Sequence, residues 1–60
     1  MELKLRKRFV NGNGTKIEIV SFGEGRILYK VIYENGVETF YDTLISSFNT
    51  VINFNGYSEI

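Results

Sequence analysis

Three cations near the start of the chain are spaced for contact with phosphate groups. Lys4, Arg6 and Arg8 alternate with other residues, so on a β-strand they would share one face at intervals of about 6.6 Å. Lys16 follows on the next expected strand, and nearby tyrosines offer rings on which bases stack. One hypothesis is therefore a nucleic-acid or nucleotide site at Lys4, Arg6, Arg8 and Lys16. Against it, the net charge is zero, and cations on an edge strand also guard against aggregation.

The sequence contains few of the residue types that catalyse reactions, because it has neither histidine nor cysteine. The commonest general base, the commonest transition-metal ligand and the thiolate nucleophile are thus missing. Glu38 and Asp42 are the closest candidate pair of carboxylates. On a strand they would lie about 13 Å apart, too far for the retaining glycosidase geometry of about 5 Å. We expect a protein that is not an enzyme, with no catalytic residue, metal site or cofactor.

Tyr29, Tyr33 and Tyr41 are the residues best suited to contact a protein partner. The chain has nine aromatic residues among 60, more than a domain of this size can enclose. Tyrosine is enriched in protein interfaces because it joins a large apolar ring to a polar group. These three tyrosines are therefore predicted to form the binding surface for a protein partner.

Length and composition predict one folded domain over residues 1–60, since 43% of the residues are apolar. A domain this small buries only about 60% of the surface of its unfolded chain, so a stabilising homodimer is considered. No apolar run approaches the ~20 residues needed to cross a bilayer, and Met1 to Arg6 lacks the apolar core of a secretory signal. With cysteine absent, we expect a cytoplasmic protein without a membrane partner.

The segment from Arg26 to Tyr41 is predicted to be a β-hairpin around Glu34-Asn35-Gly36. Asn-Gly accepts the positive φ values of tight hairpin turns, and both flanking runs are rich in Val, Ile, Tyr and Phe. Both faces of its first strand are apolar, so the sequence does not determine which of them faces solvent. One face carries Ile27, Tyr29, Val31 and Tyr33, and the other carries Leu28, Lys30 and Ile32.

Two further strands are expected before this hairpin. Alternation predicts a strand from Leu3 to Val10, with Leu3, Leu5 and Phe9 on its inner face. A second strand is expected from Thr15 to Ser21, after an Asn-Gly loop at residues 11–14.

The C-terminal part allows two interpretations. The preferred one is a helical turn from Asp42 to Phe48, a last strand from Thr50 to Phe54, and a loosely held tail from Asn55 to Ile60. The alternative is a longer helix from about Thr43 to Ile52, because apolar residues recur there at helical spacing. Thr, Ser, Asn, Val and Ile are weak helix formers, which favours the strand.

These elements predict an all-β fold: a small five-stranded barrel with a short helical turn before the last strand. The alternative is a four-stranded sheet with a C-terminal helix from about Thr43 to Ile52. The order of elements resembles SH3-like barrels, mainly over Gly25 to Phe54. Trp and Pro are absent, so the proline-rich ligands of SH3 domains are not expected.

The compact plan also resembles small barrel proteins encoded by bacteriophages and mobile elements, through a Gly turn, an Ile-rich strand, a Tyr-rich hairpin and the Phe-bearing turn Ser46-Ser47-Phe48. The resemblance implies an accessory factor that binds and inhibits a host or defence protein, located in the host cytoplasm. The remaining hypotheses are the nucleic-acid or nucleotide-binding barrel and a structural or assembly subunit.

Overall fold

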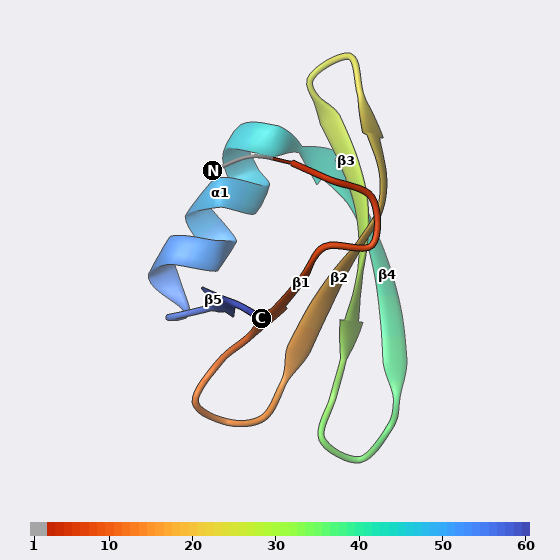
Figure 1. Ribbon diagram of the computed structural model, residues 1–60. Helices are drawn as coiled ribbons and strands as arrows, with labels where there is room; N and C mark the ends of the chain where they lie inside the picture. Colours follow the sequence, from red (N-terminus) through yellow and green to blue (C-terminus); the bar gives the residue numbers. More distant parts are fainter. Residues whose placement is uncertain (1–2) are drawn as a thin grey trace.

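The computed structural model describes residues 3–60 as five antiparallel strands and one helix (Figure 1). In chain order they are β1 (Arg8–Val10), β2 (Lys16–Gly23), β3 (Arg26–Ile32), β4 (Glu38–Leu44), α1 (Ile45–Phe54) and β5 (Ser58–Glu59). The strands form one sheet in the order β4-β3-β2-β1-β5. This arrangement confirms the predicted five-stranded, small β-barrel-like fold, with a short helix where a helical turn was predicted before the last strand.

The β3–β4 hairpin forms as predicted. Tyr33 N–H donates to the Val37 carbonyl at 2.8 Å, and Gly36 N–H donates to the Tyr33 carbonyl at 2.9 Å. Gly36 has a φ of 88°, the left-handed conformation that only glycine adopts without strain. This turn fixes the register of the whole hairpin, in which Lys30 lies opposite Phe40 and Tyr29 opposite Tyr41.

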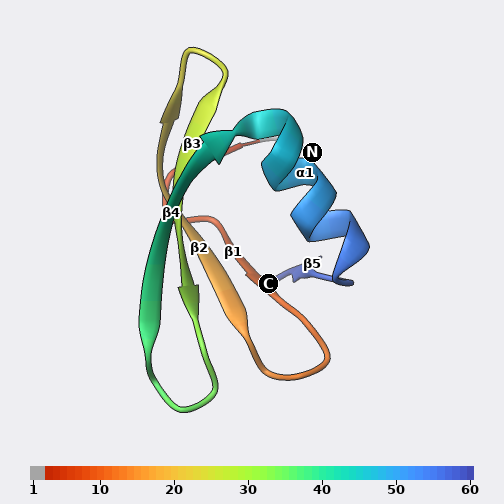
Figure 2. The ribbon, with the colours of Figure 1, turned by 180° about the vertical axis from the view of Figure 1, so that it is seen from behind.

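The core lies between α1 and one face of the sheet, which we call the inner face (Figures 1 and 2). Ile27, Tyr29 and Val31 of β3 are buried there, so this is the core face of the central strand. Leu28, Lys30 and Ile32 point to the opposite, outer face and are half-buried. Within residues 3–60, the remaining buried apolar residues are Phe9, Ile17, Ile19, Phe48 and Ile52.

The predicted strand from Thr50 to Phe54 is wrong, because this segment belongs to α1. Phe48 and Ile52, four residues apart, share one stripe of α1 and are both buried against the sheet. Packing of that stripe outweighs the weak helix propensity of the surrounding residues. The helix therefore matches the alternative from about Thr43 to Ile52 more closely than the predicted helical turn.

The tail after α1 is also ordered differently from the prediction. Gly56 has a φ of 69°, and Tyr57 N–H donates to the Ile52 carbonyl at 3.0 Å, which closes the helix with a left-handed cap. Tyr57 then packs against the core, and β5 pairs with β1. The expectation of a loosely held tail is therefore wrong for residues 57–59.

The first strand is shorter than the predicted Leu3 to Val10, because β1 begins only at Arg8. Lys7 N–H bonds to the Lys4 carbonyl at 3.2 Å, and Arg6 has a positive φ of 64°. The chain from Lys4 to Lys7 thus forms a turn that remains attached to β2 through Arg6 N–H and the Ile19 carbonyl, 2.8 Å apart. The strict alternation expected of Leu3, Leu5 and Phe9 does not hold through this turn, and Leu5 is exposed.

Candidate binding surface on the outer face of the sheet

A row of four side chains crosses the outer face from β1 to β4. The strand register places Arg8 opposite Glu18, Glu18 opposite Lys30, and Lys30 opposite Phe40. Residues directly opposite each other in an antiparallel sheet share a face and contact one another. Because the neighbouring residues Ile17 and Ile19 are buried in the core, the row itself faces away from α1.

Glu18 is the centre of this row and is only 6% exposed. Arg8 Nε donates a hydrogen bond to Glu18 Oε1 at 2.8 Å, and Lys30 Nζ lies 3.9 Å from Glu18 Oε2. Lys30 Nζ also lies 3.6 Å from Glu38 Oε1 on β4. A buried carboxylate requires such partners, and the ion pairs that run from Arg8 through Glu18 and Lys30 to Glu38 link four adjacent strands through their side chains.

The charged neighbours determine the protonation of Glu18. The hydrogen bond from Arg8 lowers the pKa of the Glu18 carboxyl below its ordinary value of 4.5, against the opposing effect of burial. The positive charges of Lys30, Arg8 and Arg6 lower the same pKa further. Glu18 therefore stays negatively charged at neutral pH, and it holds the surrounding cations in place.

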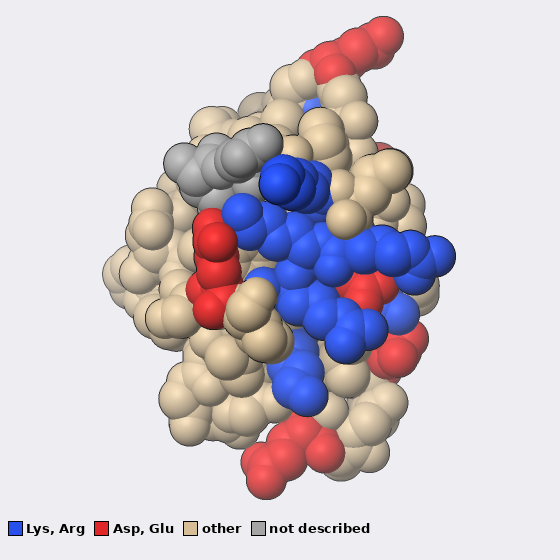
Figure 3. All heavy atoms as spheres, in the orientation of Figure 1, with Lys and Arg blue, Asp and Glu red and all other residues tan. Residues whose placement is uncertain are grey.

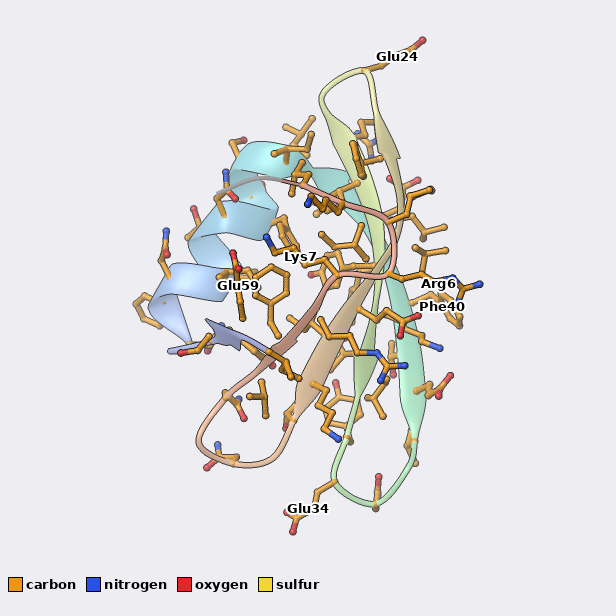
Figure 4. The ribbon with its side chains drawn as sticks, in the orientation of Figure 1. Arg6, Lys7, Glu24, Glu34, Phe40 and Glu59 are labelled. Atoms are coloured by element: carbon orange, nitrogen blue, oxygen red, sulfur yellow. The ribbon has the colours of Figure 1, made fainter. Side chains whose placement is uncertain are left out.

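A shallow hollow of about 370 Å³ opens beside this row. Its lining combines three kinds of side chain: the cations Arg6 and Lys30, the buried carboxylate Glu18, and apolar side chains, namely Leu5, Ile19, Val20 and Phe40. Phe40 is 58% exposed, and Leu5 is exposed as well. Figure 4 shows Arg6 and Phe40 directed to the same side of the molecule, although they come from the first turn and from β4.

Lys and Arg gather in one patch across the middle of the molecule, with most acidic side chains at its margins (Figure 3). The tips of the two long hairpins carry Glu24 and Glu34, which point away from it (Figure 4). Lys7 is directed to the other side, where its Nζ lies 2.9 Å from Glu59 Oε1. The sheet face thus presents positive charge within and around a partly apolar hollow.

The four cations predicted from the sequence are only partly brought together. Arg8 and Lys16 lie on the outer face of β1 and β2, and Arg6 lines the hollow from the first turn. Lys4 lies in the same turn outside any strand, so the expected line of three cations along one strand does not form. Sequence reasoning missed Lys30, Glu18, Phe40 and Leu5 as members of this surface.

The three predicted tyrosines do meet, but on the inner face. Tyr29 is 5% exposed and belongs to the core: its ring stacks on Tyr41 with centroids 5.5 Å apart, and it packs against Phe48 at 5.0 Å. Burial raises the pKa of Tyr29, and a hydrogen bond with Tyr33 raises the pKa of Tyr41. Tyr33 and Tyr41 are exposed. Tyr29 itself therefore offers almost no surface to a partner.

Two other features are absent from residues 3–60. No group of three or more His, Cys, Asp and Glu residues lies close enough together to hold a metal ion. No helix in this part of the chain has the length and apolar character needed to cross a membrane.

The fold and its surface thus define a small antiparallel β domain with a cationic, partly apolar hollow on its outer face. No protein-family model, curated protein or solved structure matches the chain.

Proposed function

We propose that this chain is a non-enzymatic binding protein whose outer-face hollow binds a protein partner through a segment that combines acidic and apolar side chains. The observation that carries the proposal is the mixed lining of the hollow. Exposed Phe40 and Leu5 lie beside Arg6 and Lys30 within one concave surface.

The apolar part of the hollow supplies the anchoring contacts. Phe40, Leu5 and Val20 are exposed large apolar side chains that line one depression. Contiguous exposed apolar surface bounded by polar groups is typical of interaction sites, and buried aromatic anchors carry most of the free energy of binding. An apolar side chain of the partner that fills the hollow removes this surface from water.

The charged part favours a protein segment over a polyphosphate. Arg6, Arg8 and Lys30 attract acidic groups, but Glu18 stands between them with a pKa that keeps it charged. A carboxylate at the centre of the surface repels a continuous chain of phosphates, whereas single Asp or Glu side chains of a peptide reach each cation separately.

The proposal includes an inhibitory role. The resemblance of the chain to small barrel proteins of bacteriophages and mobile elements suggests that the partner is a host or defence protein, which the bound chain would block. A small domain with a concave binding face is suited to cover a functional surface of its partner.

A selection from a random peptide library displayed on yeast tests the site before the natural partner is identified. Against the immobilised protein we expect enriched peptides in which Asp or Glu accompanies a Leu, Ile or aromatic residue. Phe40→Ala is expected to weaken binding of the enriched peptide about tenfold or more, because it removes the main apolar anchor of the hollow. Isothermal titration calorimetry measures the affinity.

Phe54→Ala is the matched control, since Phe54 is 86% exposed at the end of α1, outside the hollow. Its peptide affinity is expected to equal that of the original chain. Enriched peptides without acidic residues, or an affinity that Phe40→Ala leaves unchanged, would reject the proposed site.

Single-stranded nucleic acid is the second candidate, favoured by the exposed ring of Phe40 opposite Lys30 and by the cations Arg6, Arg8 and Lys16. Stacking on an aromatic ring next to basic side chains is a common mode of single-strand binding. An oligothymidine probe in fluorescence anisotropy tests this candidate. It requires binding at low salt that weakens steeply between about 50 and 200 mM salt, and absence of binding at low salt removes it.

A further inference from the structure

Within residues 3–60, β4 forms one edge of the sheet. Every second residue of β4 directs its backbone N–H and C=O groups to this open edge. Tyr33 N–H bonds to the Val37 carbonyl, and Ile45 N–H bonds to the Gly25 carbonyl at 2.9 Å, at the two ends of the β3–β4 ladder. Hydrogen-bonded pairs alternate along an antiparallel ladder. Thr39, Tyr41 and Thr43 therefore direct their backbone groups to β3, and the residues between them direct theirs to the open edge.

This edge is long and partly apolar. Its seven residues include Phe40 on the outer face and Tyr41 on the inner face, and both rings are exposed. Among residues 3–60, Figures 1 and 2 show no element beside β4 on the side away from β3. Arg26 Nη2 reaches one edge acceptor, the Asp42 carbonyl, at a long distance of 3.5 Å. An exposed edge of this length pairs readily with another strand unless charges prevent it.

We infer that β4 pairs with β4 of a second copy of this chain, antiparallel and centred on Tyr41, to join two sheets into one. This register overlaps all seven residues of β4. It places Tyr41 opposite Tyr41 of the second copy, Phe40 opposite its Asp42, and Glu38 opposite its Leu44. Phe40 and Asp42 then exchange hydrogen bonds with the second copy through the groups that face the open edge.

The charges on β4 select this register. Pairing centred on Phe40 would place Glu38 opposite Asp42 of the second copy, and pairing centred on Asp42 would place that residue opposite itself. Like charges directly opposite each other are destabilising. Centred on Tyr41, no two acidic residues are opposite each other, and the interface is self-complementary as a two-fold dimer requires.

The neighbouring strand β3 adds complementary charge. Arg26 lies beside Leu44, and Lys30 lies beside Phe40 within one chain. In the dimer, Arg26, Leu44 and Glu38 of the second copy lie in one row across the joined sheet. Lys30, Phe40 and Asp42 of the second copy lie in another. The acidic residues of each β4 thus lie between cations of both chains, which favours a second copy over an unrelated acidic strand. The inference does not depend on the proposed function.

Single-cysteine variants test the register, because the sequence contains no cysteine of its own. At the centre of the pairing, the two copies of residue 41 form a non-hydrogen-bonded pair with Cα atoms about 4.5 Å apart, within disulfide range. Tyr41→Cys is expected to form a covalent dimer of twice 6.9 kDa on mild oxidation, seen by non-reducing electrophoresis. Val37→Cys is the control, since residue 37 lies far from its copy in this register.

Val37 is the more exposed of the two positions, at 53% against 42% for Tyr41, so random collision would favour the control. Cross-linking of Tyr41→Cys that is no faster than that of Val37→Cys overturns the inference. So does sedimentation equilibrium of the original chain that gives the mass of one chain up to millimolar concentration. A monomer at millimolar concentration would mean that only strands of other proteins remain as partners for the edge of β4.

A pair of variants at Leu44 separates the dimer from effects within one chain. Leu44→Glu places an acid opposite Glu38 of the second copy but beside Arg26 of its own chain, and Leu44→Lys reverses both relations. We expect the dimer dissociation constants of the two variants, measured by sedimentation, to differ about tenfold, with Leu44→Lys the tighter. The stability of the monomer should change in the opposite direction. Equal dissociation constants, or the reverse order, contradict the register.

Discussion

Phe48→Ala is expected to remove a large part of the free energy of unfolding of this protein. Phe48 is fully buried, and its ring packs edge-on against Phe9 at 6.0 Å and against Tyr29 at 5.0 Å. Truncation of a buried Phe costs about 3–5 kcal/mol. A domain of 60 residues has a free energy of unfolding of about 3–9 kcal/mol in all. Urea denaturation followed by circular dichroism measures the loss.

Phe54→Ala provides the comparison, because Phe54 ends the same helix but is almost fully exposed. A surface substitution of this kind changes the free energy of unfolding by about 0.5 kcal/mol or less. Equal effects of the two substitutions would mean that α1 does not pack on the sheet through Phe48.

Glu18→Gln is expected to reduce the free energy of unfolding by about 1–2 kcal/mol. The amide keeps the size of the side chain but loses the charge that pairs with Arg8 and Lys30. Hydrogen bonds to charged groups contribute about 1.5–3 kcal/mol, and the exposure of Arg8 reduces that figure. The same substitution adds positive charge to the outer face, so binding of the selected acidic peptide is expected to tighten while stability falls.

The difference in free energy of unfolding between the original chain and Glu18→Gln depends on pH. The pKa of Glu18 is lower in the folded chain than its ordinary value of 4.5. Its contribution to stability is therefore present above about pH 4.5 and is lost as the pH falls through the folded pKa. The stability gap between the original chain and Glu18→Gln should narrow on acidification, and a gap that widens would contradict the assigned role.

Asp42→Asn is the control for charge removal at the surface. Asp42 pairs with Arg26 at 3.1 Å, but both side chains are more than half exposed. Exposed ion pairs contribute about 0–1 kcal/mol. A cost for Asp42→Asn as large as that for Glu18→Gln would show that burial of Glu18 is not what makes its ion pairs stabilising.

The elements that the sequence predicted well are those encoded locally. Asn35-Gly36 specifies its own turn, and that turn determines the register of β3 and β4. The helix was harder to predict, because Ser, Thr, Asn, Val and Ile favour it only weakly. It forms because Phe48 and Ile52 gain burial against a sheet that the local sequence does not contain.

The candidate site was predictable in part. Counting back from the Asn35-Gly36 turn pairs Lys30 with Phe40, and alternation in the second strand places Glu18 on the face opposite Ile17 and Ile19. The position of Leu5 on the outer surface was not predictable. The chain turns through a positive φ at Arg6, where no glycine or asparagine indicates a turn.

Tyr29 shows what the predicted tyrosine surface lacked. The sequence predicted exposed tyrosines because nine aromatic residues exceed what a domain of this size encloses, and that count does not say whether the ring of Tyr29 is buried. In the structure, Phe48 of α1 packs directly on that ring. The exposed partner-binding candidates therefore move to the other face of the same strands, where Phe40 and Lys30 lie.

Chemical-shift mapping tests the outer-face site most directly. In ¹⁵N–¹H spectra of the chain titrated with the selected acidic peptide, the largest amide shifts should fall at Arg6, Glu18, Lys30 and Phe40, the residues around the hollow. Phe54 and its neighbours at the end of α1 should remain unshifted. Shifts concentrated at Tyr33, Tyr41 or the end of α1, with the hollow unchanged, would contradict the proposed binding surface.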